Sequence, residues 1–262
     1  MIQTLLNIYD HYLYALVAIV GTALGVALVQ WLLRYSRWAA WARSLHGVAP
    51  PFINIIGVLF GLTLAFLAND TWIAHDRATT AVFREADALH SLVTLSNALP
   101  EPMQGQVRAA IANYSQASAA EWVLLAKRQS SPEVLEQADR LLRLLASREL
   151  ARASGDNVQT LMLHKVNNIR EERDQRIGLS QTHVNPLKWL GMAFLGFVTL
   201  LSLAVVHVEN HRAALTAMVV FSLAAAPTAA IVLIQGNPFE EPSAVSPAPI
   251  AAVVASLALD HK

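Results

Sequence analysis

The chain has 262 residues, of which 55% are hydrophobic and only 15% are charged. This balance lies outside that of soluble globular domains and indicates a membrane protein, so the lipid bilayer is the first partner we expect. Basic and acidic residues number 19 each and cysteine is absent, which argues against a nucleic-acid partner and excludes disulfides, thiolate nucleophiles and cysteine-ligated metals.

Four stretches are long and apolar enough to cross a hydrocarbon core of about 30 Å. The first covers residues 12–33 and is too long an apolar run for a cleaved signal, so we expect an uncleaved anchor. The others run from about Pro51 to Trp72, Leu187 to His207 and Ala213 to Gln235. We therefore expect an all-α integral membrane protein with four transmembrane helices arranged as two hairpins.

Between the second and third spans, apolar residues recur at helical spacing among most of the acidic residues of the chain. Breaks near Pro100, Pro132 and Gly155 predict a water-facing insert of four helices, each of about 20 to 27 residues. We expect the first to continue span two and the last to run into span three. The predicted domains are a hairpin at 1–73, a helical extramembrane domain at 74–183, a second hairpin at 184–235 and a C-terminal segment at 236–262.

The C-terminal segment begins with a proline-containing turn at Asn237, Pro238 and Phe239. The apolar run from Ile250 to Leu259 is too short to span a bilayer, and it predicts a short interfacial or docking helix. A disordered tail is the alternative.

Arginine in the short loops indicates which side of the membrane each segment faces. The loop at 34–50 contains Arg34, Arg37 and Arg43 without an acidic residue, and Arg212 lies in the other short turn. By the positive-inside rule these loops are cytoplasmic. The helical insert and both termini would then lie outside a bacterial inner membrane, in the periplasm. Arginines near the membrane ends of the insert oppose this assignment.

Charged residues occur within the apolar stripes of the insert helices. Glu85, Glu121 and Arg173 occupy stripe positions. At about 1.5 Å per residue, Glu85 and Arg173 lie at similar heights above their spans, with Tyr114 close to the same level. Because a buried carboxylate or guanidinium must be paired, we predict a buried polar network of Glu85, Tyr114, Glu121 and Arg173, with Arg176 as a candidate member. Within it we expect Glu85 to pair with Arg173. If the stripes are rotated by one position, these charges simply face water.

The second span has one face of small residues, and it supports two interpretations. Gly57 and Gly61 form a GxxxG pair, as do Gly21 and Gly25 in span one, which is typical of close helix packing in membranes. The same side carries Asn54, which could form a polar ring in a pore, with the first amides of the helix offering positive dipoles to an anion.

The sequence contains only weak candidates for a metal-binding or catalytic site. His207 and His211 have a spacing that could hold a metal from one helix face, but no third ligand accompanies them. We find no phosphate-binding glycine loop, nucleophile elbow or paired acids in a recognisable cleft. We therefore expect neither an enzyme, nor a metal site, nor a cofactor.

In its order of motifs the chain resembles the bacterial bestrophin-like membrane proteins, a family of unassigned function named for its likeness to bestrophin anion channels. The resemblance rests on Gly57 to Leu64 and Trp72, Glu85, Leu99-Pro100, Tyr114, Glu121-Trp122, Arg173 with Arg176, Asn237-Pro238-Phe239, Val245-Ser246-Pro247 and Pro249. Where the family typically has Asp before Pro-Phe, this chain has Asn237.

The resemblance implies a homo-oligomeric channel for small anions, pentameric by analogy, with a pore lined by span two. The candidate pore residues are Phe52, Asn54, Leu59, Phe60 and Phe66. It also implies a cytosolic insert, against the arginine count. The alternative function is a non-conducting membrane scaffold or envelope sensor whose insert binds a partner.

Overall fold

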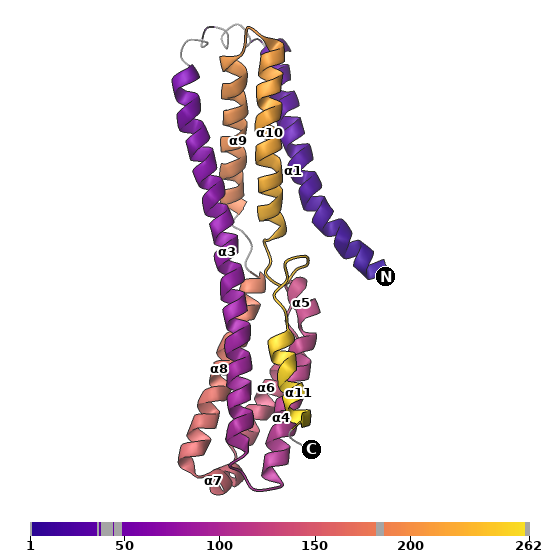
Figure 1. Ribbon diagram of the computed structural model, residues 1–262, viewed down its shortest axis with the longest axis vertical. Coiled ribbons are helices and arrows are strands. Elements are labelled where there is room, and N and C mark those ends of the chain that lie inside the picture. The colour runs from indigo at the N-terminus through magenta and orange to yellow at the C-terminus, as the bar shows by residue number, and fades with distance from the viewer. Residues whose placement is uncertain (1, 36, 38–43, 45–48, 182–185, 260–262) are drawn as a thin grey trace. The chain divides into compact units, whose positions relative to one another are not determined.

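The computed structural model describes residues 2–35, 37, 44, 49–181 and 186–259 (Figure 1). All regular elements within these ranges are helices, which confirms the all-α fold class. The chain divides into two compact units, one formed by residues 1–72 and 183–236 and the other by residues 73–182 and 237–262. We call them the membrane unit and the extramembrane unit.

The membrane unit contains α1 (Ile2–Tyr35), the first part of α3 (Ala49–Ser96), α9 (Pro186–Val206) and α10 (His211–Ile234). All four helices are long and apolar enough to cross a membrane. α1, α9 and α10 lie side by side (Figure 1) and share a small core of Val29, Leu200, Ala204 and Met218. These helices carry apolar residues on nearly every side, as expected of segments surrounded by lipid.

The helix α3 is continuous over 48 residues, from Ala49 to Ser96. It confirms that the first insert helix continues span two. No glycine or proline interrupts it after Gly61, and it ends shortly before Leu99 and Pro100, where proline disfavours a helical residue before it. The predicted continuation of the last insert helix into span three falls on residues 182–185, outside the described residues.

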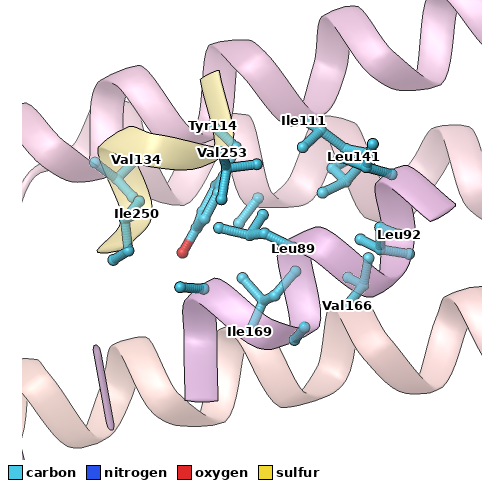
Figure 2. Packing of buried hydrophobic residues seen from close by; sticks show 14 of the residues in the cluster. Leu89, Leu92, Ile111, Tyr114, Val134, Leu141, Val166, Ile169, Ile250 and Val253 are labelled. Atoms are coloured by element: carbon cyan, nitrogen blue, oxygen red, sulfur yellow. The ribbon is translucent and has the colours of Figure 1, made fainter. Parts of the chain in front are cut away.

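The extramembrane unit contains the rest of α3, α4 (Met103–Ala120), α5 (Trp122–Ala126), α6 (Pro132–Leu145), α7 (Arg148–Ser154), α8 (Asp156–Gln181) and α11 (Ala248–Leu259). Side chains from α3, α4, α6, α8 and α11 converge on one hydrophobic core (Figure 2). Ile250, Val253 and Leu257 of α11 are buried there, so the short C-terminal helix docks on this unit.

Two of the four long insert helices expected from the sequence are broken. The second is interrupted at Glu121, between α4 and α5. The third is divided into α6 and α7 because Ser147 caps α7, its hydroxyl accepting a hydrogen bond from Leu150 N at 3.2 Å. The prediction of four long helices was therefore too simple.

The end of α5 is a left-handed turn that positions part of the site described below. Arg128 has φ 62°, and the amide of Gln129 donates to the carbonyl of Leu124 at 2.9 Å while that of Arg128 donates to Leu125 at 2.9 Å. This is the hydrogen-bond pattern of a Schellman motif, here with arginine where glycine is usual. The turn reverses the chain and returns Ser131 towards Glu121.

Candidate ion pathway and buried ionic network

The membrane part of α3 packs on one side only. Phe60, Leu64 and Leu67 are buried against residues of α9 and α10. The other side is exposed within the chain, and its bulky members recur at helical spacing: Ile55, Leu59, Leu62 and Phe66. We call these four residues the α3 outer face.

The candidate pore residues do not all lie on that face. Leu59 is 48% exposed and Phe66 is 68% exposed, and Asn54 is also exposed. Phe60 instead points inward, with its ring centroid 5.2 Å from that of Phe221. Phe52 belongs to α3, but its side chain lies outside the described residues. The structure therefore separates Phe60 from Asn54, Leu59 and Phe66.

Only one of the four predicted packing glycines lies at a close helix contact within the chain. A Cβ atom on Gly25 would lie 3.3 Å from Leu200 Cδ1, whereas a Cβ on Gly21, Gly57 or Gly61 would meet nothing within 4 Å. Sequence reasoning missed Gly196, where a Cβ would lie 3.2 Å from the Phe60 ring. Gly196 thus allows α9 to approach Phe60 closely.

In the extramembrane unit, Glu85 and Arg176 form a fully buried ion pair. Arg176 Nε donates to Glu85 Oε2 at 2.7 Å and Nη2 donates to Oε1 at 3.1 Å. The Glu85 Oε1 atom also accepts hydrogen bonds from Tyr114 at 2.8 Å and from Ser118 at 3.0 Å. This bidentate geometry satisfies the buried carboxylate almost completely.

A second buried pair joins Glu121 to Arg173. Arg173 Nη2 donates to Glu121 Oε1 at 2.6 Å and Nε donates to Oε2 at 3.2 Å. The turn after α5 completes this pair, because Ser131 N donates to Glu121 at 2.8 Å and Ser131 O accepts from Arg173 at 3.0 Å. Ser131 was not among the predicted residues, since its part depends on the left-handed turn at Arg128.

The two pairs form one cluster, and it differs from the sequence expectation in its pairing. Arg176 Nη2 lies 3.8 Å from Glu121 Oε2, so Arg176 faces both carboxylates and links the two pairs. Two guanidinium groups and two carboxylates balance in charge. The structure brings all five predicted side chains together, but Glu85 pairs with Arg176 rather than Arg173. We call Glu85, Tyr114, Glu121, Arg173 and Arg176 the ionic network.

Burial and charge shift the pKa values within the network. Burial raises the pKa of the Tyr114 hydroxyl well above its ordinary 10.0, and the nearby Glu85 carboxylate raises it further. Burial alone would lower the pKa of Arg176, but its interactions with Glu85, Tyr114 and Glu121 together outweigh burial, and the pKa is raised. Tyr114 is therefore a neutral hydrogen-bond donor and Arg176 a permanent cation.

The C-terminal turn contacts the network through Trp122. The Arg176 guanidinium carbon lies 4.7 Å from the centre of the Trp122 ring, and Trp122 Nε1 donates to Val245 O at 2.6 Å. Phe239 packs edge-on against Trp122 with ring centroids 5.7 Å apart. The carbonyl of Pro238 accepts from Val245 N at 2.8 Å, which closes the turn.

The side-chain amide of Asn237, at a position where the resemblance would have an acid, is suited to its surroundings. Its Nδ2 donates to the carbonyls of Leu125 and Ala126, both at 3.1 Å, while Oδ1 accepts from Phe239 N at 3.0 Å. An ionised carboxylate has no hydrogen to donate to these carbonyls. In this chain Asn237 therefore fastens the C-terminal turn to the end of α5.

The chemistry available to these sites is electrostatic and structural. Within the described ranges, no group of three or more His, Asp or Glu side chains is placed to hold a metal ion. The charged groups of the ionic network are all buried in the extramembrane unit. The network can fix the relative register of α3, α4 and α8, and the α3 outer face can line a path or pack against another chain.

Comparison with known proteins assigns the fold to a family. The Bestrophin-like domain model matches residues 20–250. Two crystal structures of a bacterial bestrophin homologue from Klebsiella pneumoniae match at 16% identity, with TM-scores of 0.66 and 0.67; they cover 96% and 95% of this chain and 98% and 97% of theirs. A crystal structure described as a membrane protein matches at 14% identity with a TM-score of 0.66, covering 96% of this chain and 98% of that one. No curated protein matches the sequence.

Proposed function

We propose that this chain, which belongs to the bestrophin-like family, forms a homo-oligomeric membrane channel for small anions. The observation that supports this most strongly is the one-sided packing of α3, which leaves Leu59, Leu62 and Phe66 exposed along one line. In a ring of subunits these residues would form an apolar constriction. A pentamer follows by analogy with true bestrophins.

Physical chemistry supports anions as the permeating species. Pro50 and Pro51 have no backbone N–H, so the amides that follow them in α3 carry the positive partial charge that favours an anion at that end of the helix. Asn54 offers an amide near the same end, and the apolar side chains further along would gate by wetting and dewetting. Gly57 and Gly61 have open space beside them within the chain, so they allow a neighbouring subunit to approach closely.

A flux measurement tests this function. Purified protein in liposomes is expected to release chloride or nitrate faster than potassium. Phe66→Ala widens the proposed constriction and should raise the anion rate by about tenfold, the effect of about 1.4 kcal/mol on a barrier. The matched control is Leu223→Ala on α10, which is 71% exposed and is expected to leave the rate unchanged. A folded oligomer without flux would contradict the channel and favour the scaffold alternative.

We also propose an inner-membrane location with the short loops in the cytoplasm, from the arginine count at Arg34, Arg37, Arg43 and Arg212. Because α11 packs within the extramembrane unit, a C-terminal fusion reports the side of that whole unit. Alkaline phosphatase fused there should be active and a cytosol-dependent fluorescent protein inactive. The reverse pattern would place the insert in the cytosol, as in the bestrophin analogy.

A further inference from the structure

We propose that the membrane unit carries a binding site for an anionic phospholipid, with the phosphate held between the end of α1 and the start of α10 and an acyl chain held deeper along the same helices. The site is separate from the α3 outer face. It depends on the membrane location of the chain and not on ion conduction.

The proposed headgroup site is a cavity of about 280 Å³ between α1, α9 and the start of α10. This volume is far larger than the roughly 30 Å³ of one water and close to the lower limit of small-ligand pockets. Gln30, Arg34 and His211 line it together with apolar side chains such as Leu33 and Val208. It therefore combines a polar end with an apolar wall.

The charges around this cavity suit a phosphate. Among the described residues lining it there is no carboxylate, and the nearest acid in sequence, Glu209, is not part of the lining. The Arg34 guanidinium carbon lies 5.6 Å from the Tyr35 ring, and within the described part of the chain Arg34 has no ion pair. An arginine can hold a phosphate by two parallel hydrogen bonds, and Gln30 and His211 add further donors.

The cavity also lies at the expected depth for a headgroup. Trp31 and Tyr35, which flank Arg34 on α1, are 56% and 70% exposed, as is typical of aromatic residues at a membrane interface. Apolar residues of α1 precede them for about 20 Å or more. A phosphate beside Arg34 would therefore be at the level of the lipid phosphates.

A second, largely apolar cavity of about 140 Å³ is lined by the same three helices and by Phe60 of α3. Gly21 and Thr22 line it from α1, Gly196 and Leu200 from α9, and Phe221 from α10. Leu200 is one helical turn from Ala204 of the first cavity, and Thr22 is about 12 Å along α1 from Gln30. A cavity lined by a cation, followed by an apolar cavity deeper along the same helices, matches the headgroup and an acyl chain of a phospholipid. A free anion would occupy only the first cavity.

The test is lipid retention by the delipidated, detergent-purified protein, measured by native mass spectrometry. We expect dioleoyl phosphatidylglycerol to be retained over dioleoyl phosphatidylcholine, and Arg34→Gln to reduce this preference about fivefold, because the charge-assisted hydrogen bonds of the guanidinium to the phosphate are lost. The control is Arg212→Gln, which removes a neighbouring charge outside the lining and should leave the preference intact. Equal losses in the two variants, or equal retention of both lipids, would overturn the proposal.

Two further variants identify which ligand the site binds. Gly21→Leu should fill the apolar cavity, where a Cβ meets nothing within 4 Å, and should weaken dioleoyl but not dihexanoyl phosphatidylglycerol. His211→Ala serves as a second headgroup variant if Arg34→Gln does not fold, and it should also reduce the preference. If inorganic phosphate displaces the lipid completely and Gly21→Leu has no effect, the site binds a free anion and the lipid proposal is wrong.

Discussion

At the scale of single residues, Arg173 and Arg176 of α8 each pair with one of two buried carboxylates. Arg173 and Arg176 are three positions apart and so project from one side of the helix. Glu85 comes from α3 and Glu121 from the junction of α4 and α5, so each arginine ties α8 to a different helix. Because removing any one of the four charged members leaves a buried charge without its partner, the network favours one register of these helices.

We expect Arg176→Gln to lower the free energy of unfolding by about 3–5 kcal/mol, because Glu85 is left buried without its partner. Adding Glu85→Gln should recover part of this loss, and the same Glu85 change combined with Arg173→Gln should be closer to additive. Denaturant titrations of wild type, the three single variants and the two double variants in detergent measure both double-mutant cycles. A stronger coupling of Glu85 to Arg173 than to Arg176 would contradict the observed pairing.

Tyr114 makes stability depend on pH at the alkaline end. Its pKa in the folded protein is raised above the ordinary 10.0, so its contribution is complete below pH 10 and is lost as pH rises through the folded-state pKa. Tyr114→Phe should therefore flatten the fall in melting temperature above pH 10 relative to wild type. An unchanged alkaline slope in Tyr114→Phe would show that this hydroxyl does not carry the effect.

At the scale of elements, the C-terminal turn and α11 are held by polar contacts at one end and apolar packing at the other. Asn237→Asp replaces two donated hydrogen bonds, to Leu125 O and Ala126 O, by an acceptor that faces acceptors. We expect this change to destabilise the docked segment by about 1–3 kcal/mol. Hydrogen exchange should speed up over α11 and the end of α5, and the matched control is Asn97→Asp at an exposed position just after α3. Equal protection of α11 in both variants would refute the anchoring role.

In the extramembrane unit the sequence predicts the helices and the buried positions better than it predicts which buried side chains contact one another. Apolar stripes at helical spacing identify the positions of Glu85, Tyr114, Glu121 and Arg173. The stripe cannot distinguish Arg173 from Arg176 as the partner of Glu85, because a small rotation of α8 exchanges them. The role of Ser131 depends on a left-handed residue at Arg128, a conformation for which an arginine gives no local signal.

The membrane helices show the same contrast. Length and hydropathy are sufficient to predict four spans, because the bilayer fixes the length that a span needs. The choice of contact residues is not predictable in this way: Gly196 approaches Phe60, whereas Gly57 and Gly61 remain open. A GxxxG pair indicates that close approach is possible, and it does not say which helix, or which chain, approaches.

At the scale of the whole molecule, each unit has its own hydrophobic core and one further distinctive feature. The extramembrane unit encloses a charge-balanced network, and the membrane unit leaves one face of α3 uncovered. A single chain has no path for an ion along such a face, since the opposite wall must come from other copies. The proposed function therefore belongs to the assembly, and the α3 outer face is where it can be tested.

The absence of cysteine from the chain makes that test direct. Single cysteines replace Phe66 or Leu59 on the α3 outer face, or Leu223 on α10 as the control, and a charged, membrane-impermeant thiol reagent is applied to the reconstituted protein. The account predicts that the reagent blocks anion flux in Phe66→Cys and Leu59→Cys and leaves Leu223→Cys unaffected. Flux that persists after complete labelling at both α3 positions would contradict a pore lined by this face.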